Sequence, residues 1–164
     1  MTADFNPGTF IDALKRADVD FVVIGGVALG LHGSALVTYD TDVMYARDRE
    51  NIERLAAALG ELEVRLRGVP ADLPFRPDAK TLQAGMNFTF TSDSGDLDIL
   101  GEVGGISSYE GLRTRARIMR LGGQEAHVAS VQDLIAMKQA AGRTKDKRAL
   151  DDLAAILELE SRGE

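Results

Sequence analysis

The sequence predicts an α+β fold, a mixed α/β arrangement in which helices flank a central mixed β-sheet and a helical segment ends the chain. Helical patterns alternate with short β-branched runs in the first part of the chain, strand patterns with glycine-containing turns follow, and helical patterns come last. The length of 164 residues suits one domain. We therefore expect a single domain over 1–164, with its core at about 7–128 and C-terminal helices at about 130–158.

The first elements are read from turn residues and apolar spacing. Asn6-Pro7 resembles an N-cap followed by a first-turn proline, and apolar residues then recur with helical spacing. Residues 20–24 form an apolar, β-branched run that ends in Gly25-Gly26, which indicates a buried strand. A short helix over about 27–32 and a second strand over 37–46 are expected next.

The middle of the chain contains one clear helix and one proline-rich stretch. Asp48 is expected to cap a helix that Gly60 ends. Residues 61–84 hold three of the four prolines, so this stretch is expected to be mainly a loop, with a short strand at 63–66 as an alternative.

The second half predicts two hairpins and two helices. Strands over 86–91 and 97–100 flank a polar turn that ends in glycine. The second hairpin joins 115–121 to 125–128 through Gly122-Gly123. The expected helices run from the cap residue Ser130 to about Ala141, and from Lys145 to Leu157.

Composition and charge exclude several classes of protein. No apolar run is long enough to cross a membrane, and the N-terminus shows no secretory signal, so we expect a cytoplasmic protein without a membrane partner. The absence of cysteine excludes disulfides and zinc-thiolate sites. A net charge of −7 makes general nucleic-acid binding unfavourable. Basic clusters at 113–120 and 143–148 form either local binding patches or solvated surface.

Asp40 and Asp42 are the first candidate site residues. Residues two apart in a strand project from the same face, so both carboxylates point to one side of the second strand. Aspartate is a poor strand former and resists burial when ionised. A divalent cation such as Mg²⁺, or Mn²⁺, would resolve this conflict because it takes carboxylate and phosphate oxygens. The alternative is the exposed face of an edge strand.

Asp98 is the third candidate, and it too lies within an apolar strand. Asp96 shares its face, so either could reach the site. Asp98 is preferred because it lies between Leu97 and Ile99, deeper in the strand, whereas Asp96 follows the turn and is expected to be solvated.

Glycine and lysine residues give candidate phosphate contacts. Gly25 and Gly26 lie where a strand meets a helix, which allows close backbone approach to a phosphate, although a tight turn alone also requires glycine. Lys138 falls on the inward stripe of its helix and either meets a triphosphate or packs its stem and extends to water. Lys145 is a second phosphate candidate or a solvated charge.

These residues together resemble the nucleotidyltransferase signature of the DNA polymerase beta superfamily. The likeness rests on Ile-Gly-Gly-Val-Ala at 24–28, His-Gly at 32–33 and Thr-Tyr-Asp-Thr-Asp-Val at 38–43. The segment 95–100 matches the strand that supplies the third carboxylate. The likeness covers residues 20–46 strongly and 86–155 loosely, and it implies the nucleotidyltransferase fold.

The tail is similar to that of minimal nucleotidyltransferases, including the toxins of bacterial toxin–antitoxin and abortive-infection systems. The matching segments are 131–138, 143–146 and 151–153. The sequence departs from this subgroup at Leu36, where members often carry arginine. If that arginine contacts nucleotide or substrate, another cation such as Arg47 replaces it here, or the activity is altered.

The resemblance implies a metal-dependent, ATP-binding nucleotidyltransferase. Asp40, Asp42 and Asp98 are its expected catalytic and metal-binding residues; the expected nucleotide-binding residues are Gly25, Gly26, Thr38, Lys138 and Lys145. It implies a nucleoside triphosphate as partner, a tRNA, protein or small molecule as hydroxyl acceptor, and a cognate antitoxin for a toxin-like member. A catalytically degenerate relative that only binds a nucleotide or a protein partner is the alternative.

Overall fold

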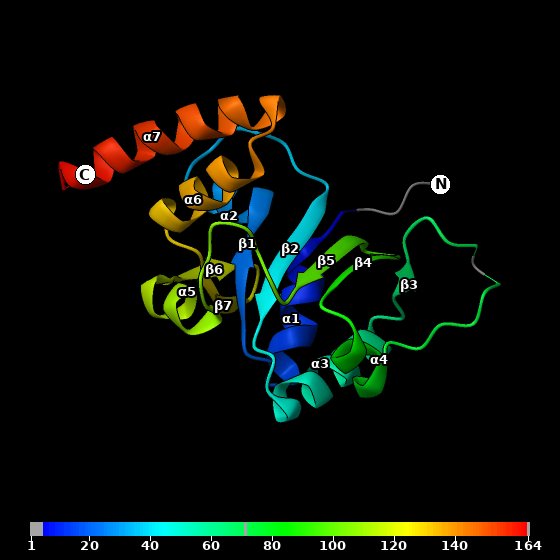
Figure 1. Cartoon of the computed structure of the whole chain (residues 1–164). Helices are drawn as coiled ribbons and strands as arrows, with labels where there is room; N and C mark the ends of the chain where they lie inside the picture. The colour runs from blue at the N-terminus through cyan, green and yellow to red at the C-terminus, as the bar shows by residue number, and fades with distance from the viewer. Residues whose placement is uncertain (1–4, 71, 164) are drawn as a thin grey trace.

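The computed structural model describes residues 5–70 and 72–163. They form a seven-stranded mixed sheet in the order β3-β4-β5-β2-β1-β7-β6, flanked by helices (Figure 1). Strand β2 pairs antiparallel with β1 and parallel with β5. The predicted α+β class and central mixed sheet are confirmed. No helix in these residues is both long and apolar enough to span a bilayer.

The N-terminal elements are α1 (Pro7–Arg16), β1 (Phe21–Ile24), α2 (Gly25–Leu31) and β2 (Asp40–Tyr45). Asn6 is the N-cap residue of α1 and Pro7 lies in its first turn, as predicted, although the Asn6 side chain makes no capping hydrogen bond. Helix α2 begins at the glycine pair itself, and β2 begins later than predicted because residues 34–39 form a loop.

The middle elements are α3 (Arg49–Glu61), β3 (Arg65–Leu66) and α4 (Ala79–Ala84). The predicted Asp48 cap is confirmed, because its carboxylate accepts a hydrogen bond from the Asn51 N–H at 3.1 Å. Helix α4 lies in the stretch predicted to be mainly loop. The Asp78 carboxylate caps it by accepting from the Thr81 N–H at 2.9 Å, a signal that the neighbouring prolines obscured.

The second half contains both predicted hairpins and three helices. The elements are β4 (Asn87–Ser92), β5 (Gly95–Leu100), α5 (Tyr109–Arg115), β6 (Arg117–Leu121), β7 (Gln124–Val128), α6 (Val131–Ala141), a 3₁₀ turn (Thr144–Asp146) and α7 (Lys147–Ser161). Helix α5 was not predicted. Ser108 caps it by accepting from the Gly111 N–H at 3.0 Å, and residue 115, expected to begin a strand, ends this helix.

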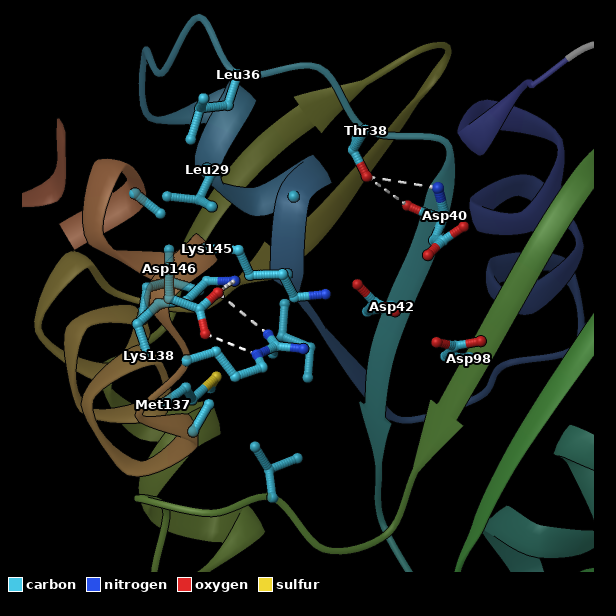
Figure 2. Close-up of a pocket in the computed structure, with 18 of the residues that line it drawn as sticks. Leu29, Leu36, Thr38, Asp40, Asp42, Asp98, Met137, Lys138, Lys145 and Asp146 are labelled. Carbon is cyan, nitrogen blue, oxygen red and sulfur yellow. Dashed lines mark hydrogen bonds and ion pairs between the residues drawn. The ribbon is translucent and has the colours of Figure 1, made fainter.

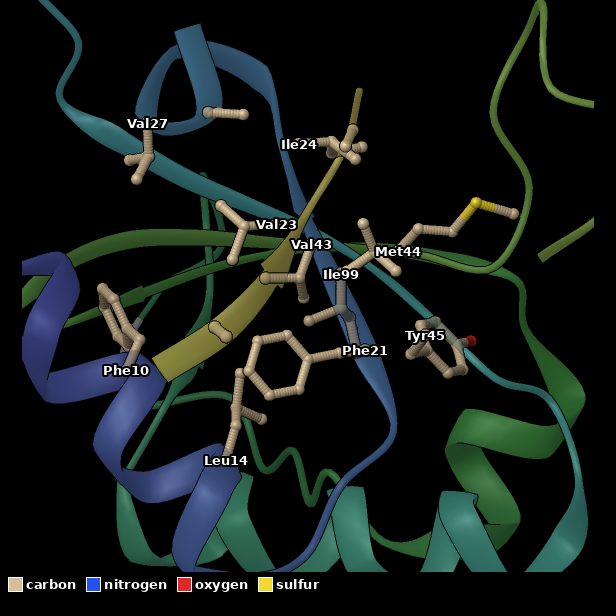
Figure 3. Packing of buried hydrophobic residues seen from close by; sticks show 14 of the residues in the cluster. Phe10, Leu14, Phe21, Val23, Ile24, Val27, Val43, Met44, Tyr45 and Ile99 are labelled. Atoms are coloured by element: carbon tan, nitrogen blue, oxygen red, sulfur yellow. The ribbon is translucent and has the colours of Figure 1, made fainter. Parts of the chain in front are cut away.

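The apolar core fixes which way the acidic residues point. Helix α1 places Phe10 against the sheet face that carries Val23, Val43 and Ile99, all of them fully buried (Figure 3). Strand side chains alternate between the two faces, so burial of Val43 turns Asp42 to the opposite face. The hydrophobic pattern of β2 and β5 therefore sets the register that brings their aspartates together.

Long-range hydrogen bonds hold the C-terminal helices against the first half of the chain. The buried His32 ring contacts the Ala129 carbonyl through Nε2 at 2.8 Å, so His32 has a structural role. The Ser34 hydroxyl donates to the Asp152 carboxylate of α7 at 2.8 Å. These contacts fix the 34–39 loop beside α7, and this loop forms one wall of the pocket described next.

Candidate functional site

Asp40, Asp42 and Asp98 come together because β2 and β5 are adjacent and parallel. In their register Asp40 lies opposite Asp96, and Asp42 lies opposite Asp98. All four carboxylates therefore project from one sheet face. Asp40, Asp42 and Asp98 line a pocket of about 600 Å³, whereas Asp96 does not line it. Of the two candidates on β5, Asp98 is therefore the one that lines this pocket.

The pocket has an acidic wall and a basic wall. Figure 2 shows the three carboxylates on one side, with Lys138 and Lys145 on the other. Gly25, Gly26 and Thr38 also line the pocket, so every residue predicted for the site reaches one cavity. The remaining lining is largely apolar: Ile24, Leu29, Leu36, Val37, Leu100, Val103, Leu134 and Met137. Such a cavity offers room for a nucleotide with its polar contacts concentrated at the two charged walls.

Burial raises the pKa of two of the pocket carboxyls, those of Asp40 and Asp42. Burial, followed by the neighbouring Asp98 and Asp40 charges, raises the pKa of Asp42 to about 7. Burial, with the Asp98 charge, raises the pKa of Asp40 as well. The Asp40 and Asp42 side chains therefore lack enough nearby positive charge to offset their burial.

Their donor chemistry fits a divalent cation. Among residues 5–70 and 72–163, no three carboxylate, imidazole or thiol groups are placed to hold a metal ion by themselves. Magnesium, however, often takes only one or two carboxylates and completes its shell with water and substrate phosphates. The Asp42 and Asp98 carboxyls, with Asp40 beside them on β2, fit a cation of this kind that arrives with a triphosphate.

The two glycines are required by close packing at the start of α2. Gly25 has a φ of 67°, and a Cβ there would lie 2.0 Å from Asp42 Oδ2. A Cβ on Gly26 would lie 2.5 Å from the Thr38 Cβ. Thr38 in turn donates its hydroxyl to the Asp40 carbonyl at 3.3 Å. The glycine pair therefore lets Asp42 of β2 and Thr38 of the preceding loop lie directly beside the helix, whether or not a phosphate binds there.

The position that departs from the family pattern is part of the pocket, but its suggested substitute is not. Leu36 adds apolar surface to the wall formed by the 34–39 loop. Arg47 follows the opposite end of β2 and donates to the Tyr45 hydroxyl at 2.8 Å and the Leu82 carbonyl at 3.0 Å. Arg47 is therefore a structural contact to α4 and does not supply a cation to the pocket.

The basic wall is partly neutralised within the protein. The Lys138 ammonium lies 3.2 Å from Asp146 Oδ1, and Arg143 Nε lies 2.7 Å from Asp146 Oδ2. Asp146 is buried, so it requires these partners. Lys145 is exposed and faces the pocket beside this network. Of the two predicted lysines, Lys138 is already paired and Lys145 is the more available to a phosphate.

The arginine cluster at 113–120 consists of ion-paired side chains. The pairs are Arg113–Asp20, Arg115–Asp133, Arg117–Glu160 and Arg120–Glu125, at 2.9, 2.8, 3.1 and 3.9 Å. Each guanidinium is thus close to a carboxylate, which reduces the positive potential that a nucleic-acid backbone would meet. The solvated-surface interpretation of this cluster fits these contacts.

Sequence reasoning missed Arg67, which contacts the acidic wall from outside the pocket. Its Nη2 donates to Asp98 Oδ1 at 2.6 Å, and its Nε lies 3.2 Å from Asp96 Oδ2. Asp96 is therefore ion-paired rather than simply solvated. The alternation of Arg65 and Arg67 about Leu66 was the available signal, but β3 is too short for that pattern to stand out.

Structural comparison finds proteins with a nucleotidyltransferase fold. The antibiotic-resistance factor ANT(2″)-Ia, as its solution structure, has a TM-score of 0.60 and 14% identity over 93% of this chain and 83% of its own. Its crystal structure in complex with adenylyl-2″-tobramycin gives 0.60 and 16%, over 94% and 88%. A protein assigned as a nucleotidyltransferase from Thermotoga maritima gives 0.53 and 17%, over 90% and 89%.

Sequence comparison adds no closer relationship: no protein-family model matches the chain, and no curated protein is similar to it in sequence. The structural likenesses confirm the predicted nucleotidyltransferase fold.

Proposed function

We propose that this protein is a metal-dependent nucleotidyltransferase that moves a nucleoside monophosphate from a nucleoside triphosphate to a hydroxyl acceptor. One observation carries the proposal: Asp40, Asp42 and Asp98 converge on one wall of a pocket whose opposite wall carries Lys138 and Lys145. Carboxylates suit a metal-bound triphosphate, and the lysines suit its negative charge. The shared fold with ANT(2″)-Ia, captured with an adenylylated product, supports the same class of reaction.

The residues divide the work between binding and proton transfer. Lys145, and Lys138 from within its ion pair, lower the negative potential met by the triphosphate, while Gly25 and Gly26 let it approach the backbone. Mg²⁺ or Mn²⁺ bound at Asp40, Asp42 and Asp98 would supply charge neutralisation at the reacting phosphate.

Asp98 accepts the proton of the acceptor hydroxyl. The acceptor oxygen forms a bond to the α-phosphorus, the bond from that phosphorus to the β-phosphate oxygen breaks, and pyrophosphate leaves.

The charge distribution favours an acceptor other than a large RNA. The 113–120 arginines are ion-paired, and the chain has a net charge of −7. Of the predicted acceptors, a small molecule or a protein therefore fits better than tRNA. The toxin-like role, with a cognate antitoxin as partner, stays a prediction from the sequence resemblance.

A nucleotide-binding protein without transfer activity is the second candidate. It is favoured by the pairing of Lys138 with Asp146 and by the lack of three ready metal ligands in the described residues. Such a protein would bind a magnesium nucleotide in the same pocket but release no pyrophosphate with any acceptor.

Pyrophosphate release distinguishes these functions. With ATP, CTP, GTP or UTP, Mg²⁺ and a panel of small-molecule, protein and tRNA acceptors, the wild type is expected to release pyrophosphate. Asp98→Asn should lower the rate by about 10²–10⁴-fold because the acceptor proton loses its base. The matched control Asp93→Asn, in the exposed β4–β5 turn, should keep the wild-type rate. Full activity in Asp98→Asn would refute the assigned role, and nucleotide binding without release would favour the second candidate.

A further inference from the structure

Arg67 reaches the acidic cluster because it extends the alternation of β3. Arg65 lies opposite Thr91 in the β3–β4 pairing, and the Arg67 N–H donates to the Thr89 carbonyl at 3.1 Å. In the β4–β5 pairing, Thr89 lies opposite Asp98. Arg67 thus lies on the sheet face that carries the aspartates, and β4 and β5 separate its strand from β2.

The Arg67 guanidinium is held at several points. Nη2 donates to Asp98 Oδ1 at 2.6 Å and to the Phe90 carbonyl at 2.8 Å. The buried Nε lies 3.2 Å from Asp96 Oδ2 without the alignment of a hydrogen bond. About one third of the Arg67 side chain is exposed, against 20% for Asp98. A planar guanidinium can bridge two carboxylates in this way, which a lysine ammonium cannot reproduce.

Arg67 does not line the pocket, so its contact with Asp98 comes from behind the acidic wall. The ion pair engages Asp98 Oδ1, and Asp98 also lies opposite Asp42 in the β2–β5 register, where both residues line the pocket. Asp98 therefore lies between a fixed cation on one side and the pocket on the other.

From this geometry we infer that Arg67 is a positioning residue for the acidic site. It supplies the positive charge that keeps Asp96 and Asp98 together before a metal binds, and it fixes the orientation of Asp98 once substrate is present. The inference rests on the proposed function, since it assigns Asp98 to proton transfer. It also predicts a property of the metal-free protein: Arg67 opposes the binding of a divalent cation through its charge.

The test uses Arg67→Gln, Arg67→Lys and the matched control Arg65→Gln, whose guanidinium lies 3.9 Å from the exposed Asp93. Binding of Mn²⁺ alone is measured by electron paramagnetic resonance titration. The kcat and the KM for ATP are measured with a hydroxyl acceptor that the wild type uses. Arg67→Gln is expected to bind Mn²⁺ about tenfold more tightly because one nearby positive charge is lost. Its kcat should fall about tenfold or more while KM for ATP changes less than about threefold.

The charge-conserving variant separates charge from geometry. Arg67→Lys should return the Mn²⁺ affinity to the wild-type value but recover kcat only in part, and Arg65→Gln should change neither quantity. If Arg67→Gln folds and leaves both the Mn²⁺ affinity and kcat unchanged, the inference is overturned. If Arg67→Gln does not fold, a wild-type kcat in Arg67→Lys overturns it instead. A wild type that neither binds Mn²⁺ nor transfers nucleotide refutes the proposed function itself, which is a distinguishable result.

Discussion

Asp42→Asn is expected to stabilise the metal-free protein at pH 8 while abolishing nucleotidyl transfer. The pKa of Asp42 is raised from 3.8 to about 7 in the folded protein, chiefly by burial and then by Asp98. A raised carboxyl pKa gives stability that is fully present below the unfolded pKa and is lost as pH rises through the folded one. At pH 8 the ionised Asp42 therefore costs on the order of 2–4 kcal/mol, which asparagine does not.

Denaturant unfolding in the presence of a chelator, at pH 4 and pH 8, measures this effect. The difference in the free energy of unfolding between Asp42→Asn and the wild type should grow from about zero at pH 4 to on the order of 2–4 kcal/mol at pH 8. The control Asp93→Asn, at an exposed carboxylate, should show no such growth. A mutant that is less stable than the wild type at pH 8 would show that burial does not strain this carboxylate.

Gly25→Ala is the second substitution with a large expected effect, in the opposite direction. The φ of 67° disfavours any residue with a side chain, and the added Cβ would lie 2.0 Å from Asp42 Oδ2. Backbone strain and overpacking together should destabilise the protein by about 2–5 kcal/mol. They should also displace the Asp42 carboxylate, so transfer activity should be lost in the fraction that still folds.

Gly30→Ala is the matched control, because it lies in the same helix with no atom within 4 Å of its added Cβ. It should leave the stability unchanged or raise it by up to about 1 kcal/mol, because alanine loses less conformational freedom than glycine at a helical position in the last turn of α2. Thermal and denaturant unfolding of both variants gives the comparison. Equal stability of Gly25→Ala and Gly30→Ala would show that α2 can shift away from β2, contrary to the tight packing at this junction.

Much of the site could be predicted because local patterns determine it. Alternation in β2 and β5 placed Asp40, Asp42 and Asp98 on the sheet face opposite the apolar core, and apolar neighbours such as Val43 and Ile99 fixed the register. The preference for Asp98 followed from its depth in the strand. The likeness of residues 24–28 and 38–43 to a family signature then predicted that the Gly25-Gly26 turn lies beside these aspartates. These features lie within a few residues of one another or within one strand pair.

The rest depends on contacts between distant parts of the chain, which one sequence does not encode locally. Arg67 meets Asp98 only because β3 and β5 both pair with β4. Asp146 neutralises Lys138 because the 3₁₀ turn folds back on α6. The position of Lys138 on the inward stripe of its helix could not reveal this partner. Arg47 was a reasonable substitute cation by proximity to β2, yet it lies at the wrong end of that strand.

Calorimetric titration of a nucleoside triphosphate tests the central claim most directly. ATP, CTP, GTP and UTP are titrated with and without Mg²⁺ into the wild type and into the double variant Asp40→Asn/Asp42→Asn. We predict that at least one nucleotide binds the wild type only with Mg²⁺ and that the double variant loses this binding, because the acidic wall then lacks two of its three carboxylates. Magnesium-dependent binding that persists in the folded double variant, or no binding of any nucleotide to the wild type, would contradict the account.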